Sequence, residues 1–229
     1  MSNSTLASAE PVTFPTAFPS LASGPALARF SLPASSDRVE RAAGALRTNG
    51  IEVRLVRDRE EARAAVLGLI PEGSEVLTVT SQTLTQLGLD TEIQRSTRFH
   101  PVRGELTQLM KEGKTSEARR LGAAPDVVIG SVHAITERGE VVIASATGSQ
   151  LGPYAYGARR VIWVAGTQKI VRDLTEAVER LEQHTFPLED ARAKKVYGAG
   201  SAIAKVLLVN REFQPGRISI ILVPENLGF

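Results

Sequence analysis

The chain has 229 residues, of which 42% are hydrophobic and 23% are charged, a composition typical of a globular protein with one large domain or two small ones. Cysteine is absent, which excludes disulfides, thiolate catalysis, and zinc or iron–sulfur centres held by cysteine. The formal net charge is +2, and aromatic residues, at 5%, are not interleaved with the densest basic stretch, 103–120. We interpret that stretch as a solvated helix face and expect no nucleic-acid partner.

The apolar runs are all short, and none approaches the 18 residues that a membrane span needs. No lysine or arginine precedes Arg29, so the first residues do not have the pattern of a secretion signal. These features predict a cytoplasmic protein without a membrane partner.

Residues 1–34 are rich in proline, serine and alanine, and they have little apolar surface to bury. We predict a loosely attached arm over this range and one α/β domain over 35–229. In the domain, segments whose apolar residues recur with the period of a strand alternate with segments whose apolar residues recur with the period of a helix. The predicted strands are 51–56, 75–80, 126–135, 140–144, 161–165, 205–210 and 217–223. The predicted helices are 37–48, 59–69, 81–87, 105–120, 170–183 and part of 187–204.

Strands that alternate with helices indicate an α/β fold, with a largely parallel sheet and helices on both faces. The turn at 137–139 and the last two strands, joined across 214–216, suggest some antiparallel pairing. The predicted sheet is therefore mixed and mostly parallel.

Three polar segments follow predicted strands, and the carboxyl ends of strands are where open α/β sheets bind ligands. They combine hydroxyl groups, backbone amides and predicted helix starts, which favour a phosphate or a carboxylate, and a lysine would add a full charge. Their residues are Ser81, Gln82 and Thr83; Thr147, Gly148, Ser149 and Gln150; and Gly166, Thr167, Gln168 and Lys169. The alternative is that each segment only caps a helix or forms a turn.

Two carboxylates, Glu137 and Glu225, follow predicted strands and are candidates for a catalytic base or nucleophile in the same cleft. Each is equally well explained as a solvated loop charge. The three histidines stand apart in the sequence, so we predict no metal site.

Several blocks together resemble the lactate-utilisation (LUD) domain family. In chain order they are 80–84, 126–137, 146–150, 160–171 and the ending 216–229, and this order is the family's. The resemblance implies a three-layer α/β/α fold similar to the NagB/RpiA/CoA-transferase group.

The resemblance also implies a bacterial protein of L-lactate oxidation to pyruvate, working with iron–sulfur partner proteins. Its expected role is an accessory or ligand-binding component for a small anionic metabolite. A nucleotide or CoA-type ligand and an oligomeric assembly are both compatible with it. The alternative is an isomerase or acyl/CoA-transferase-like enzyme with a strand-end carboxylate, and the residues leave open whether the protein catalyses a reaction.

This chain departs from the family pattern at three places. Ser149 and Gln150 stand where relatives often have Asn-Arg, and Gln168 stands where they often have Asn. Many relatives also carry a cysteine cluster where this chain has 194–201, with no cysteine. No cofactor is therefore expected to bind covalently or through cysteine, and redox chemistry would belong to a partner.

Overall fold

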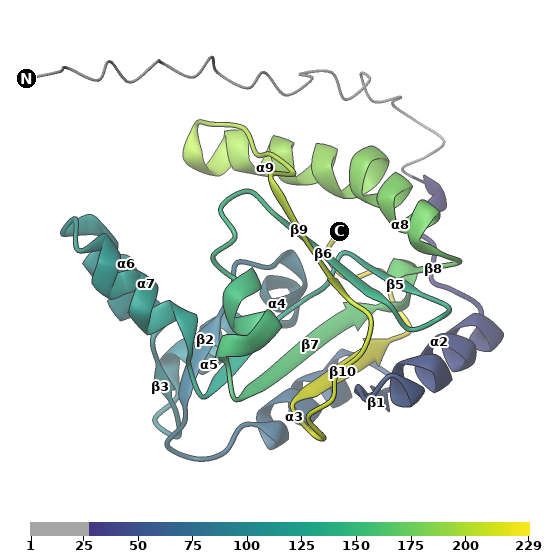
Figure 1. Ribbon diagram of the computed structural model, residues 1–229, viewed down its shortest axis with the longest axis horizontal. Coiled ribbons are helices and arrows are strands. Elements are labelled where there is room, and N and C mark those ends of the chain that lie inside the picture. The colour runs from purple at the N-terminus through teal and green to yellow at the C-terminus, as the bar shows by residue number, and fades with distance from the viewer. Residues whose placement is uncertain (1–27) are drawn as a thin grey trace, which may run out of the picture.

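The computed structural model describes residues 28–229, in which two stacked β-sheets lie between helices (Figure 1). The larger sheet has six strands, and every neighbouring pair in it is parallel. In spatial order its strands are β1 (Glu52–Leu55), β10 (Ile218–Val223), β7 (Arg160–Gly166), β4 (Val127–Gly130), β2 (Glu75–Thr78) and β3 (His100–Pro101).

The smaller sheet has four strands and collects the antiparallel pairs. In spatial order they are β8 (Ile170–Val171), β5 (Ala134–Thr136), β6 (Val141–Ser145) and β9 (Lys205–Val209). β5 and β6 form the hairpin expected at 137–139, and β9 pairs antiparallel with β6. The predicted α/β/α architecture, with mixed and mostly parallel pairing, is confirmed.

Three helix groups complete the layers. On the outer face of the larger sheet lie α3 (Arg59–Leu69), α4 (Gln82–Leu87) and α5 (Leu89–Arg95). On the outer face of the smaller sheet lie α8 (Leu174–Arg180) and the π-helical turn η3 (Leu181–Thr185), which continues into α9 (Phe186–Tyr197). The helix α2 (Ser36–Thr48) packs at the edge of the space between the sheets.

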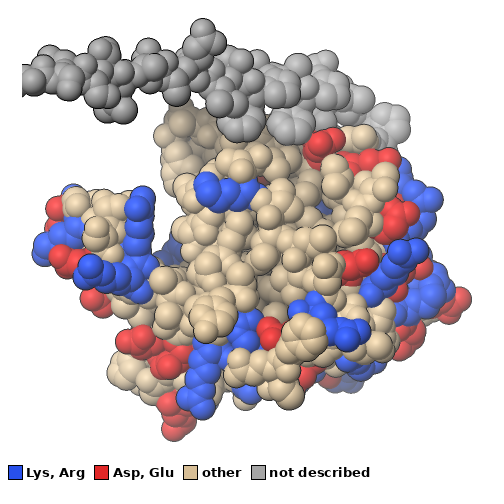
Figure 2. All heavy atoms as spheres, viewed as in Figure 1, with Lys and Arg blue, Asp and Glu red and all other residues tan. Residues whose placement is uncertain are grey.

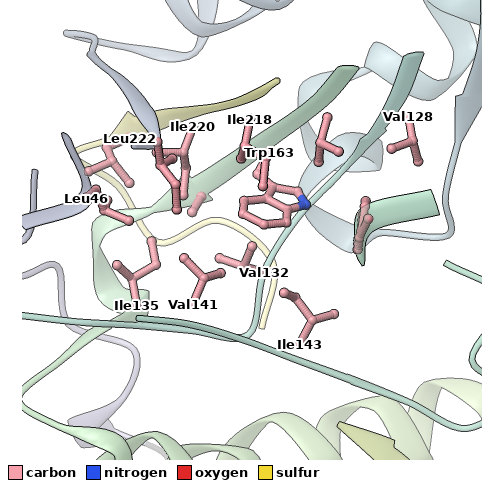
Figure 3. Close-up of a cluster of buried hydrophobic side chains, with 14 of the residues drawn as sticks. Leu46, Val128, Val132, Ile135, Val141, Ile143, Trp163, Ile218, Ile220 and Leu222 are labelled. Atoms are coloured by element: carbon pink, nitrogen blue, oxygen red, sulfur yellow. The ribbon is translucent and has the colours of Figure 1, made fainter. Parts of the chain in front are cut away.

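The main core fills the space between the two sheets. Figure 3 shows Ile218, Ile220 and Leu222 of β10 facing residues of the smaller sheet, such as Ile135 and Val141. Trp163 lies in the middle of this cluster, and its ring meets Tyr154 edge to face at 5.5 Å between centroids. Burial of these apolar faces against each other holds the two sheets together and fixes their relative position.

Several sequence predictions about elements are wrong. The predicted helix over 105–120 is two helices, α6 (Arg103–Lys111) and α7 (Thr115–Ala123), because Gly113 adopts a φ of 74° that ends the first one. They form a hairpin away from the sheets, where Figure 2 shows acidic side chains beside the basic ones.

The last two strands do not pair with each other. β9 joins the smaller sheet and β10 joins the larger one, so the segment around 214–216 crosses between sheets. The helix predicted over 170–183 is also wrong at its start, because Ile170 lies in β8, and its apolar residue Val178 is half exposed. The buried face of α8 carries Ala177 and Arg180 instead.

The arm predicted over 1–34 lies largely outside the described residues, which begin at 28. Its described end is docked: Phe30 is buried against the smaller sheet and meets the ring of His184. Arg29 forms an ion pair with Glu176. Within residues 28–229, no helix combines the length and apolar character that crossing a membrane requires.

Candidate functional site

A pocket of about 380 Å³ opens where strands of both sheets end. Its walls come from the segment after β2, the crossing after β4, the end of β6, the 3-10 turn after β7, and η3 with α9. A volume of this size accommodates a small metabolite or part of a larger ligand.

Lys169 enters the pocket from the 3-10 turn η2 (Thr167–Lys169), and only 1% of its surface is exposed. Its Nζ lies 3.1 Å from Oγ1 of Thr83 and 2.9 Å from Oγ of Ser131. Among the described residues no carboxylate forms an ion pair with it. Burial, together with the positive charge of Arg180, holds the pKa of Lys169 well below its usual range.

The hydroxyls of Ser131 and Thr83, beside Lys169, each donate a hydrogen bond to a backbone carbonyl. Ser131 Oγ donates to the carbonyl of Val164 at 2.7 Å, and Thr83 Oγ1 donates to that of Leu227 at 3.2 Å. Both oxygens can therefore accept hydrogen bonds from Lys169. A neutral amine has two N–H groups and one lone pair, so this arrangement uses both N–H groups and leaves the lone pair uncommitted.

His133 lines the same pocket, and its Nδ1 accepts a hydrogen bond from the backbone N–H of Ala144 at 3.0 Å. Burial and the nearby charges of Lys169 and Arg180 lower the pKa of His133 to about 3. The ring is therefore neutral at physiological pH. Because Nδ1 accepts, Nε2 carries the proton and is a hydrogen-bond donor.

Arg180 lies behind His133, on the side away from the pocket lining, and is fully buried. Its Nη1 donates to the carbonyl of His133 at 2.5 Å and to Oγ1 of Thr185 at 2.9 Å. Its Nε and Nη2 have no hydrogen-bond partner within the described chain, and no carboxylate there pairs with it. Burial lowers its pKa to about 9, a sign of how costly this uncompensated charge is.

The wall formed by α9 carries a compensated charge. Arg192 donates to both carboxylate oxygens of Glu189 at 2.6 and 2.7 Å, and its guanidinium lies 5.3 Å from the ring centre of Tyr197. All three line the pocket. Arg192 therefore neutralises the carboxylate of Glu189. The positive charges of Arg180 and of protonated Lys169 make the electrostatic potential near the pocket positive.

Comparison with known families decides the relationship: the model of the LUD domain matches residues 39–223. The chain belongs to the LUD domain family. Among solved structures, it is similar to a DUF162 family protein from Deinococcus radiodurans, with 15% identity and a TM-score of 0.51, over 83% of this chain and 99% of that one. This likeness concerns the fold.

A second solved structure, eIF2B beta from Chaetomium thermophilum, is similar over 52% of this chain and 44% of that one, with 14% identity and a TM-score of 0.35. No curated protein matches the chain.

The LUD domain brings together about half of the residues that the sequence proposed for the ligand. Those that line the pocket are Ser81, Gln82, Thr83, Thr147, Gln150 and Lys169. Those that do not line it are Gly148, Ser149, Gly166, Thr167 and Gln168. Gln168 is buried and donates its amide to the carbonyl of Leu227 at 2.9 Å, so it holds the segment 225–229 against the sheet. Leu227 in this segment is fully buried.

The prediction that Glu137 or Glu225 shares the cleft is wrong. Neither lines the pocket, and each is held by arginine. Glu137 accepts from Arg38 at 2.5 Å and from Arg41 at 2.9 Å, and these bonds hold its pKa below the usual range although burial opposes them. Glu225 pairs with Arg59 at 2.6 Å. Two carboxylates committed to surface arginines are poorly placed to act on a ligand in the pocket.

The sequence did not identify Ser131, His133, Arg180 or Arg192 as site residues. Ser131 directly follows β4, so it met the strand-end criterion. The apolar run 126–135 predicts one continuous strand, which hides this end, whereas the chain leaves the larger sheet after Gly130 and enters the smaller one at Ala134. Arg180 was missed because a charged residue on a helix is normally solvated.

Proposed function

We propose that this LUD-domain protein is an accessory or ligand-binding component of L-lactate oxidation to pyruvate, and that its pocket binds a small molecule bearing a carboxylate or a phosphate. The observation that carries the proposal is the buried amine of Lys169, which lines the pocket and for which the described chain provides no acidic partner; the buried Arg180 adds positive charge nearby. An anionic ligand would supply the missing partner.

The polar groups around the pocket suit such a ligand. Lys169 offers its amine, and the neutral ring of His133 offers its Nε2 proton. These donors can bind the oxygens of a carboxylate or a phosphate, and a 2-hydroxy acid or a 2-oxo acid adds a further oxygen for the same groups. Because the chain has no cysteine, the iron–sulfur clusters of lactate oxidation would belong to partner proteins.

The test is isothermal calorimetry with lactate, pyruvate, a nucleotide and an acyl-CoA, applied to the wild type and to Lys169→Met. We expect at least one ligand to bind, and the substitution to weaken its binding by about 30-fold or more, because it removes the charged partner of a buried anion.

The matched control is Lys111→Met, which removes an exposed lysine on α6 and should leave the affinity unchanged. Equal affinities in the wild type and Lys169→Met, or no binding of any of the four ligands, would contradict the proposal.

A further inference from the structure

Ser131, Lys169 and Thr83 form a chain of side chains that ends in the pocket. Ser131 is partly exposed and lines it, its Oγ lies 2.9 Å from Lys169 Nζ, and that Nζ also lies 3.1 Å from Thr83 Oγ1. A nucleophile in hydrogen-bond contact with a base, which a third group orients, is the arrangement that activates serine in acyl-transfer enzymes.

Lysine rarely acts as a base because it is normally protonated, and the surroundings of this lysine lower its pKa and so favour the neutral amine. Lys169 is 1% exposed and has no carboxylate partner in the described chain, so burial disfavours its ammonium form. The titratable and charged groups that influence it are His133, which is neutral, and Arg180, which opposes a second positive charge.

We propose that Ser131 is a nucleophile activated by Lys169, and that the pocket accepts a small activated acyl ester or thioester whose acyl group is transferred to Ser131 Oγ. The inference rests on the pocket of the proposed function and adds a reaction to it. It also replaces the strand-end carboxylate expected from the sequence with a strand-end serine.

Ser131 and Lys169 supply the nucleophile and the proton carrier that the acyl transfer needs. The hydroxyl of Ser131 rotates from the Val164 carbonyl toward Lys169, whose lone pair takes the proton as Oγ forms a bond to the acyl carbon. The bond from the acyl carbon to the leaving oxygen or sulfur then breaks. The leaving group takes the proton from Lys169, which gives an alcohol or thiol, an acyl ester on Ser131 and a neutral lysine. Water can release the acyl group as a carboxylic acid.

The experiment uses p-nitrophenyl acetate as the acyl donor and the full chain. We expect a burst of p-nitrophenolate equal to the amount of protein, an intact mass raised by one acetyl group, and acetylated Ser131 in the peptide map. Ser131→Ala should lose all three signals. Ser116→Ala, which removes an exposed hydroxyl on α7, should leave them intact.

Lys169→Met should slow the acylation of Ser131 about 100-fold or more, the contribution typical of a general base. If that variant does not fold, the pH profile of the wild type replaces it, and the burst rate should fall as Lys169 becomes protonated at lower pH. The proposal is overturned if the acetyl group is found on a lysine, if Ser131→Ala keeps the burst, or if the burst rate does not depend on pH. Failure of the burst with intact anion binding would reject this inference and leave the proposed function standing.

Discussion

At the scale of single residues, the site depends on basic side chains that are buried without an acidic partner in the described chain. Lys169, His133 and Arg180 all have a lowered pKa, and for each the first cause is loss of contact with water. The sequence identified Lys169, because it follows a strand. It could not show that the lysine is buried without a carboxylate, because that depends on which side chains the other strands bring to it.

His133 allows a direct test of this burial. Its pKa in the folded protein is about 3 instead of 6.5, so below pH 6.5 the unfolded chain binds a proton that the folded protein does not. Stability should therefore fall as the pH decreases from about 6.5 toward about 3, by about 1.4 kcal/mol per pH unit.

The variant His133→Asn keeps an acceptor for the N–H of Ala144 and removes the titration. Urea unfolding between about pH 6.5 and pH 5 should show a shallower loss of stability for the variant than for the wild type. Parallel pH profiles for the two proteins would mean that His133 is not held neutral.

At the scale of elements, the helices with strong local signals were the most predictable. α3 agrees with its prediction at both ends because Asp58 caps it through the N–H of Glu61 and Pro71 follows it. The segments that change sheets were not predictable. The run 126–135 and the last two strands satisfy the strand period, but only tertiary packing assigns each to its sheet.

Gly130 ends β4, and the close approach of Tyr154 requires it. A Cβ at this position would lie 1.8 Å from Tyr154 Oη and 2.5 Å from Val79 Cγ2, so side chains at the pocket rim would have to move. We expect Gly130→Ala to lower the free energy of unfolding by about 1–3 kcal/mol.

The matched control is Gly68→Ala in α3, where a new Cβ has no atom within 4 Å. It should raise stability by up to about 1 kcal/mol because alanine favours the helix. Chemical denaturation of both variants measures the difference, and a neutral Gly130→Ala would contradict the packing described for Tyr154.

At the scale of the whole molecule, the three segments selected by the rule that ligands bind at the carboxyl ends of strands line one pocket. The segments after β2, β6 and β7 do meet there, although they come from two sheets instead of one. The rule did not separate the residues that face the pocket from those that face the core, as the buried amide of Gln168 illustrates. Nor did it reveal the wall from η3 and α9, which are helices over the smaller sheet.

The central claim is that burial lowers the pKa of Lys169 in the pocket and that an anion bound beside it raises this pKa again. Calorimetric titration in two buffers of different ionisation enthalpy, from about pH 7 to pH 9, counts the protons taken up on binding. We predict uptake of a fraction of a proton by the wild type and none by Lys169→Met. No uptake by the wild type, or equal uptake by both proteins, would contradict the claim.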